Sequence, residues 1–258
     1  KYWSKHNQRL VYCAGKKDGI QSRGAMYMWR CLLTCYNKKT FDILDTKKLS
    51  KITLEEFRTI FQDDSGNDVL PELEKRHKNW LDLATKLNDL FEGKTLNIIK
   101  SCNNSLIKFT NSFRQFKAFD DPLSKMIMVN AIMHQGRGLI KFEQPIIPGM
   151  DYQLLKQLLR QGVIVAPADI EEKIKNYELL DNNEAMELRK AGLFALHEIM
   201  NQTSIPGDYI DNMIWGNRTK CEDEEPICMI SKEEECPFHK FCSKKTELMI
   251  PLEDTRYY

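Results

Sequence analysis

Helical periodicity recurs from residue 52 to residue 217 and restricts this chain to a helical architecture. The stretch "ITLEEFRTIF" begins with a capping box, in which Thr53 is the N-cap and Glu56 follows three residues later. The stretch "DYQLLKQLLRQG" has leucines at helical spacing and ends at Gly162. Strand signals are scarce, so we predict an all-α protein. Further helices are expected over residues 70–91, 105–116, 121–135, 182–202 and 207–217.

The stretch "GRGLIKFEQPIIPGM", residues 136–150, is the one long irregular connection, and it is rich in glycine and proline. The 258 residues are enough to bury a sizeable core. We therefore expect two helical lobes on either side of this connection. Loops framed by rigid helices commonly carry functional sites.

Apolar runs in the chain are far too short to span a bilayer. The first residues, "KYWSKHNQRL", are polar and basic and do not resemble a secretory signal. We expect a monomer in the cytoplasm or nucleus, with no membrane partner and with reduced thiols. Four cysteines scattered among apolar residues are expected to be small buried hydrophobes. These are Cys13, Cys31, Cys35 and Cys102.

Charge is unevenly distributed, although the net charge is only +1. Residues 221–236 hold seven acids and one base, whereas residues 1–60 hold 13 bases and five acids. A basic half with one acidic loop is compatible with a phosphate-bearing partner. A solvated lysine-rich surface is the alternative, and charge runs most often have that explanation.

Four further cysteines fall within 22 residues near the end of the chain, in the pattern C-x6-C-x7-C-x5-C. Structural zinc sites usually contain two short C-x2-4-C pairs, and no gap here is that short. Four thiolates with longer gaps suit an iron–sulfur cluster. The spacing therefore favours an iron–sulfur cluster over zinc, and a cysteine-rich loop without metal stays a third alternative. The expected ligands are Cys221, Cys228, Cys236 and Cys242.

The flanks of these cysteines resemble the iron–sulfur tail of the helix-hairpin-helix (HhH-GPD) DNA glycosylases. Gly216 precedes the first cysteine, Pro226 precedes the second, and Pro237 follows the third, as in that family. The middle gap departs from the family, because it has seven residues instead of two. The resemblance implies a two-lobed helical glycosylase fold with a C-terminal [4Fe–4S] loop. The implied parts are a basic extension (1–50), a glycosylase-like domain (51–220) and a cluster loop with its tail (221–258).

The same resemblance extends to "PIIPGMDYQLLKQLLRQG". It places Asp151 at the position of the family's catalytic aspartate and Gln153 where the family has histidine. "IPGM" lacks the second glycine of the family's DNA-binding hairpin. Asp151 also begins a leucine-spaced helix, so a role as helix N-cap is an equal alternative.

A second resemblance, from about Lys51 to Arg218, is to the queuosine salvage proteins, which are queuosine-nucleotide N-glycosylases. Their Asp-x-x-x-Trp pattern is matched by Asp211 and Trp215. Their Glu-x-Arg pattern is matched by Glu187 and Arg189. That family lacks the iron–sulfur tail.

Both families break the C–N bond between a sugar and a base. The sugar becomes positively charged as this bond stretches, so a fixed carboxylate stabilises it and activates water. The candidate carboxylates are Asp151, Asp211 and Glu187. The candidate substrate-binding residues are Tyr152, Gln153, Arg189 and Trp215. Simpler roles stand beside each: a helix cap for Asp151, first-turn acids for Asp208 and Asp211, a solvated pair for Glu187 and Arg189, and core packing for the aromatic residues.

We predict an N-glycosylase that removes a base, expected to be a modified one, from DNA. The first alternative is a queuosine-nucleotide N-glycosylase acting on a free nucleotide. The second is a non-catalytic nucleic-acid binding module with a structural cluster. Lys125 and Lys156 are discounted as lyase nucleophiles, because exposed lysines greatly outnumber catalytic ones.

Overall fold

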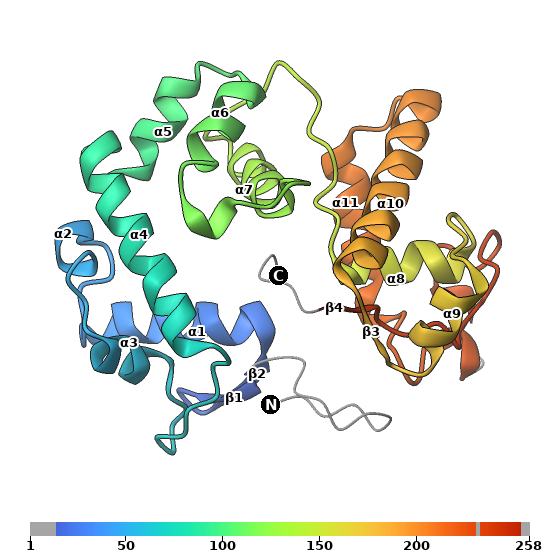
Figure 1. The fold of residues 1–258 in the computed structure, drawn as a ribbon, viewed down its shortest axis with the longest axis horizontal. Helices are drawn as coiled ribbons and strands as arrows, with labels where there is room; N and C mark the ends of the chain where they lie inside the picture. Colours follow the sequence, from blue (N-terminus) through green and yellow to red (C-terminus); the bar gives the residue numbers. More distant parts are fainter. Residues whose placement is uncertain (1–13, 231–232, 254–258) are drawn as a thin grey trace. The chain divides into compact units, whose positions relative to one another are not determined.

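The structure is a computed structural model that describes residues 14–230 and 233–253. This part of the chain is mostly helical, with eleven α-helices and only two small pairs of strands, so the all-α prediction is confirmed at that level (Figure 1). The chain divides into two compact units. Unit 1 comprises Lys1–Ser101 and Arg114–Ala118, and unit 2 comprises Cys102–Phe113 and Phe119–Tyr258. The irregular connection at residues 136–150 lies inside unit 2, so the expectation that it separates two lobes was wrong. The predicted boundaries after residues 50 and 220 stay predictions.

Unit 1 begins its described part with a β-hairpin that the sequence analysis did not predict. Its strands pair antiparallel, and Asp18 and Gly19 form the turn with positive φ angles of 53° and 76°. An Asp-Gly pair favours such a tight turn, so this local signal was available in the sequence. The elements of unit 1 are β1 (Ala14–Lys17), β2 (Ile20–Arg23), α1 (Gly24–Lys38), α2 (Thr46–Leu49), α3 (Leu54–Phe61), α4 (Leu73–Phe91) and most of α5 (Thr95–Cys102).

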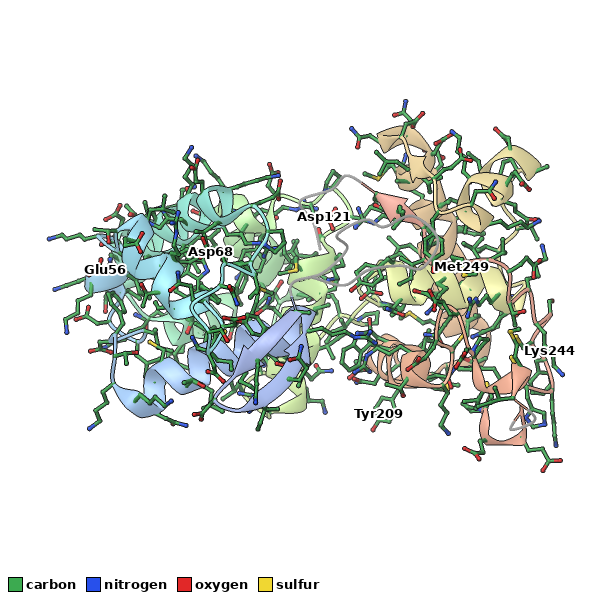
Figure 2. The ribbon with its side chains drawn as sticks, turned by 90° about the horizontal axis from the view of Figure 1, so that it is seen from below. Glu56, Asp68, Asp121, Tyr209, Lys244 and Met249 are labelled. Carbon is green, nitrogen blue, oxygen red and sulfur yellow. The ribbon has the colours of Figure 1, made fainter. Side chains whose placement is uncertain are left out.

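An aromatic cluster joins α3 to α4 in the core of unit 1. Phe57 contacts Trp80 edge-on, with 5.2 Å between ring centroids, and both pack near the buried ring of Phe61. The predicted capping box at the start of α3 is confirmed, because the side chains of Thr53 and Glu56 each accept a hydrogen bond from the other residue's backbone N–H. The hydrogen bonds that the Glu56 carboxylate accepts from the backbone N–H and the hydroxyl group of Thr53 lower the pKa of Glu56, which Figure 2 labels.

Unit 2 is built around α8, which packs against α10 and α11. All seven side chains from Leu154 to Arg160 are buried, including those of Lys156, Gln157 and Arg160. As predicted, the helix ends at Gly162, whose φ is 74°. The helices of unit 2 are α6 (Leu106–Phe113), α7 (Lys125–Gly136), α8 (Tyr152–Gln161), α9 (Ala168–Lys175), α10 (Asn182–Thr203) and α11 (Gly207–Gly216). A parallel pair of two-residue strands, β3 (Leu179–Leu180) and β4 (Leu252–Glu253), completes the unit.

Two sequence expectations about local structure have clear outcomes. Cys31, Cys35 and Cys102 are buried, as predicted, and Cys13 lies outside the described residues. The prediction that Asp211 lies in the first turn of its helix was wrong, because α11 begins at Gly207 and Asp208 alone is an acid of its first turn. Within the described ranges, no helix has the length and apolar character needed to cross a membrane.

Candidate functional site

Asp151 ends the irregular connection and begins α8. Its Oδ1 accepts hydrogen bonds from the backbone N–H groups of Gln153 and Leu154, both at 2.9 Å. The capping role predicted for Asp151 is therefore observed. Its Oδ2 accepts no hydrogen bond from the residues that the structure describes. That second oxygen remains free to interact with a bound molecule.

Asp211, on α11, lies at the same turn. Its Oδ2 accepts a hydrogen bond of 2.8 Å from the backbone N–H of Gly149. The side chain is almost fully buried, and burial raises the pKa of Asp211 from 3.8 to about 6. The negative charges of Asp151 and Asp208 raise this pKa further, whereas the Gly149 hydrogen bond and the positive charge of Lys125 lower it.

Gly149 allows the connection to approach α7 closely. A Cβ added here would lie 2.8 Å from Cγ2 of Val129 and 3.1 Å from the carbonyl oxygen of Lys125. Real Cβ atoms essentially never come as close as the first distance, so a larger residue would displace the turn. The stretch "IPGM" was compared above only with a DNA-binding hairpin, whose second glycine it lacks. In the structure its glycine amide binds a buried carboxylate of the same unit.

A buried ion pair fixes the start of α7 next to this turn. Arg189 Nη2, on α10, contacts Asp121 Oδ2 at 2.8 Å, and each side chain is only 1% exposed. The same carboxylate accepts hydrogen bonds from the backbone N–H groups of Leu123 and Lys125. Arg189 is therefore an internal residue of unit 2. The alternative of a solvated Glu187–Arg189 pair was wrong.

The other candidates occupy different environments. Glu187 is exposed and pairs with Lys190 at 2.8 Å. Gln153 has a buried Oε1 without a hydrogen-bond partner among the described residues. This oxygen can therefore accept a hydrogen bond from an N–H or O–H group of a ligand. Trp215 is 38% exposed, and the guanidinium carbon of Arg218 lies 3.3 Å from its ring centroid. Tyr152 is partly buried at the start of α8. The catalytic and binding roles of these residues stay predictions.

An open hollow of about 1000 Å³ lies along the irregular connection. Most of its wall is formed by residues 138–146, which supports the expectation that this connection borders a site. Gln135 and Asp208 also line it, and Gln135 Nε2 donates a hydrogen bond of 3.1 Å to Asp208 Oδ2. Asp151 and Asp211 are not among its lining residues.

The four C-terminal cysteines line a second, smaller hollow together. All four are free thiols and partly buried. Within residues 14–230 and 233–253, no three His, Cys, Asp or Glu side chains are grouped so that they could hold a single metal ion. The predicted [4Fe–4S] cluster thus stays a prediction.

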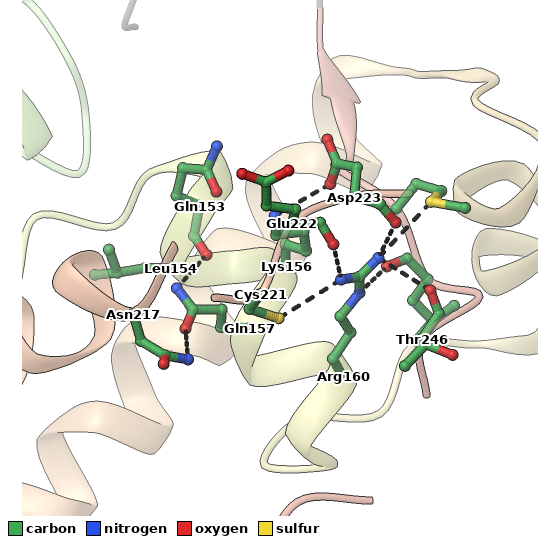
Figure 3. A network of polar contacts seen from close by, with 12 residues as sticks. Gln153, Leu154, Lys156, Gln157, Arg160, Asn217, Cys221, Glu222, Asp223 and Thr246 are labelled. Atoms are coloured by element: carbon green, nitrogen blue, oxygen red, sulfur yellow. Dashed lines mark hydrogen bonds and ion pairs between the residues drawn. The ribbon is translucent and has the colours of Figure 1, made fainter. Parts of the chain in front are cut away.

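Sequence reasoning missed the residues of α8 that contact this cysteine loop (Figure 3). Lys156, which was expected to be exposed, is buried and pairs with Asp223 at 3.1 Å. Burial lowers the pKa of Lys156, while the Asp223 carboxylate acts in the opposite direction. Arg160 donates hydrogen bonds to four backbone carbonyl groups. Helical spacing alone does not reveal these contacts, because their partners lie more than 60 residues away in the chain.

Comparison with known proteins agrees with the second of the two resemblances. A family model described as queuosine salvage protein matches residues 2–244, which is nearly the whole chain. A search of the curated proteins found no match. The match favours the free-nucleotide alternative over the prediction of a DNA glycosylase, for which no comparison provides support. The chain belongs to the queuosine salvage protein family.

Proposed function

We propose that this protein hydrolyses the C–N glycosidic bond of a free queuosine nucleotide and releases the base. The observation that carries the proposal is the pair of buried aspartates at the Gly149 turn. Asp151 is held by two backbone N–H groups, whereas Asp211 is held by one and has a pKa of about 6. Two carboxylates in unequal environments are typical of sites that divide charge stabilisation from proton transfer.

In this mechanism the two carboxylates have different tasks. As the C–N bond breaks, its electron pair moves to the base and the sugar becomes positively charged. The free Oδ2 of Asp151 stabilises that charge. Asp211, mostly ionised at pH 7, takes a proton from the attacking water and then gives a proton to the departing base. The products are the free base and the sugar phosphate, and Asp211 returns to its starting state.

Gln153 is the side chain that we assign to base recognition. Its buried Oε1 lacks a partner among the described residues and belongs to the first turn of α8, two positions after Asp151. A buried carbonyl oxygen without a partner is unfavourable, so a donor N–H on the base would satisfy it. Trp215 offers a partly exposed ring, with Arg218 already over it. A base would therefore stack on the remaining face.

The test is base release, measured by mass spectrometry, from matched substrates. We expect release from queuosine monophosphate by the parent and a large loss of rate in Asp151→Asn and Asp211→Asn. The exposed-acid variant Glu55→Gln, at a residue with no assigned role in the site, serves as the charge-matched control and should retain the rate of the parent. Full activity in both aspartate variants would overturn the mechanism.

The same assay separates the proposal from its two alternatives. Release from an oligodeoxynucleotide containing the modified base, but not from the nucleotide, would restore the DNA glycosylase prediction. Binding of nucleic acid without any release would favour a non-catalytic module. Salt provides an independent measure, because binding to a polyanion weakens steeply with added salt and binding of one phosphate weakens much less.

A further inference from the structure

Three short 3-10 turns and the segment that leads to Cys242 bring the C-terminal thiols to a common hollow. Cys221 follows the 3-10 turn Asn217–Thr219, Cys228 lies within the turn Ile227–Met229, and Cys236 directly follows the turn Glu233–Glu235. Cys242 comes six residues later and completes the wall. The remaining wall has an apolar part, formed by Pro226, Ile227 and Phe238, and a polar part. The polar part is formed by Arg160, Gln161, Asn217, Lys220, His239 and Lys244.

Arg160 supplies positive charge to this hollow. Its guanidinium is buried and donates to the carbonyl oxygens of Leu248, Glu222, Asp223 and Thr246 at 2.6–2.9 Å. Nη1 also lies 3.5 Å from Sγ of Cys221 (Figure 3). Within the described ranges it forms no ion pair with a carboxylate. An arginine side chain is always charged, so its position beside a thiol favours an anionic group in the hollow.

We propose that Cys221, Cys228, Cys236 and Cys242 hold a [4Fe–4S] cluster that fastens the C-terminal loop to α8 and α11. The gaps of six, seven and five residues lack the short pairs of zinc sites and suit a bulkier group. A preassembled cluster supplied by an iron–sulfur donor would bind by ligand exchange, in which four Fe–S bonds to this chain form as the bonds to the donor's thiolates break. The protons of the four cysteine thiols would pass to the departing donor thiolates. The bound cluster with its thiolates is anionic, and Arg160 lies beside it.

The loop is connected to the two helices that carry the aspartates. The side-chain amide of Gln157, on α8, donates a hydrogen bond of 2.7 Å to the carbonyl oxygen of Ile214, on α11. Nδ2 of Asn217 donates a hydrogen bond of 2.9 Å to Oε1 of Gln157, and the same Nδ2 lies 3.9 Å from Sγ of Cys236. Lys156 adds the buried ion pair with Asp223 in the loop. Loss of the cluster would therefore loosen α8 and α11 without removing any group that contacts substrate.

The direct test is metal analysis of the full-length chain, purified without oxygen and reconstituted with iron and sulfide. We expect about four iron atoms and four sulfide ions per chain, and a broad absorption at about 400 nm. Stoichiometric zinc without iron, or no bound metal after reconstitution, would overturn the proposal. This result does not depend on whether the protein releases a base, so it can fail while the proposed function holds.

Variants localise the cluster. Cys228→Ser and Cys236→Ser should each reduce bound iron several-fold, whereas Cys31→Ala, which removes a buried thiol of unit 1, should leave it unchanged. Equal iron content in all three would place the metal elsewhere and contradict the assignment. If a serine variant fails to fold, Arg160→Lys provides a second readout, since it keeps the charge but loses the fork that holds the loop. It should shift the reduction potential of the cluster, and an unchanged potential would contradict the role of Arg160.

Discussion

Replacing Asp211 with asparagine should stabilise the protein at neutral pH and greatly slow base release. Burial raises the pKa of Asp211 from 3.8 to about 6, a difference of about two units. Each unit corresponds to about 1.4 kcal/mol, so the ionised carboxylate destabilises the fold by about 3 kcal/mol at pH 7. Asparagine is neutral, and its side-chain oxygen can still accept the hydrogen bond from the backbone N–H of Gly149. Its amide group adds an unsatisfied donor, so the expected net gain is about 1–2 kcal/mol.

The effect should depend on pH in a defined direction. Because the pKa of Asp211 is raised in the folded state, the folded protein binds more protons than the unfolded chain between about pH 3.8 and 6. Its contribution to stability is fully present below pH 3.8 and is lost as the pH rises through about 6. Asp211→Asn has no carboxylate to ionise at this position, so it does not lose stability in this way. The difference in unfolding free energy between the variant and the parent should therefore grow between pH 4 and 7 and then level off.

Urea denaturation of the parent and Asp211→Asn at several pH values from 4 to 8 measures this difference. Glu187→Gln, which removes an exposed carboxylate, controls for the change in net charge. Base release by the parent should rise with pH through about 6 and then level off, and Asp211→Asn should lose about 10²–10⁴-fold in rate. The reasoning is refuted if the variant is less stable at pH 8, or if the stability difference is the same at pH 4 and pH 8.

Four further single substitutions and one double variant test two helix N-caps, the Gly149 turn and the buried ion pair. Asp151→Ala and Asp181→Ala each remove an N-cap that accepts two backbone N–H groups, so each should lower the unfolding free energy by about 1 kcal/mol. Only Asp151→Ala should abolish base release. If both variants release the base at the same rate, Asp151 acts only as a helix N-cap. Gly149→Ala would bring a Cβ to 2.8 Å from a valine side chain on α7 and should cost about 1–3 kcal/mol, measured by thermal unfolding; an unchanged Tm would show that the turn relaxes freely. Arg189→Met leaves Asp121 buried without its partner and should cost about 3–5 kcal/mol in urea denaturation. Adding Asp121→Asn should recover much of that loss, and no recovery would contradict the charge argument.

Local chemistry made several elements predictable from the sequence. Two features depend on neighbouring residues alone and could therefore be predicted. They are the capping box of Thr53 and Glu56 and the left-handed conformation of Gly162. The mostly helical fold followed from periodicity for the same reason. The hairpin turn at Asp18 and Gly19 was equally local but was overlooked among the basic residues around it.

The surroundings of the candidate site were not predictable, because they depend on pairs distant in the chain. The partners Asp121 and Arg189 are 68 residues apart, and Gly149 and Asp211 are 62 apart. A single sequence does not show which of these residues meet. Arg160 illustrates the same limit, since arginine in a leucine-spaced helix ordinarily faces water, whereas here it is enclosed by the C-terminal loop.

The enclosed helix α8 has a consequence for how this sequence can vary. An ordinary surface helix tolerates exchange among polar residues, because water replaces whatever contact is lost. From Leu154 to Arg160, α8 has no exposed side chain, and its polar residues bind carbonyl groups or a carboxylate on other segments. Even the glycine that ends it adjoins the side chain of Ser243, next to the last cysteine. We therefore expect natural variation in this helix to occur together with matching changes in the C-terminal loop, so that the two segments evolve as one piece.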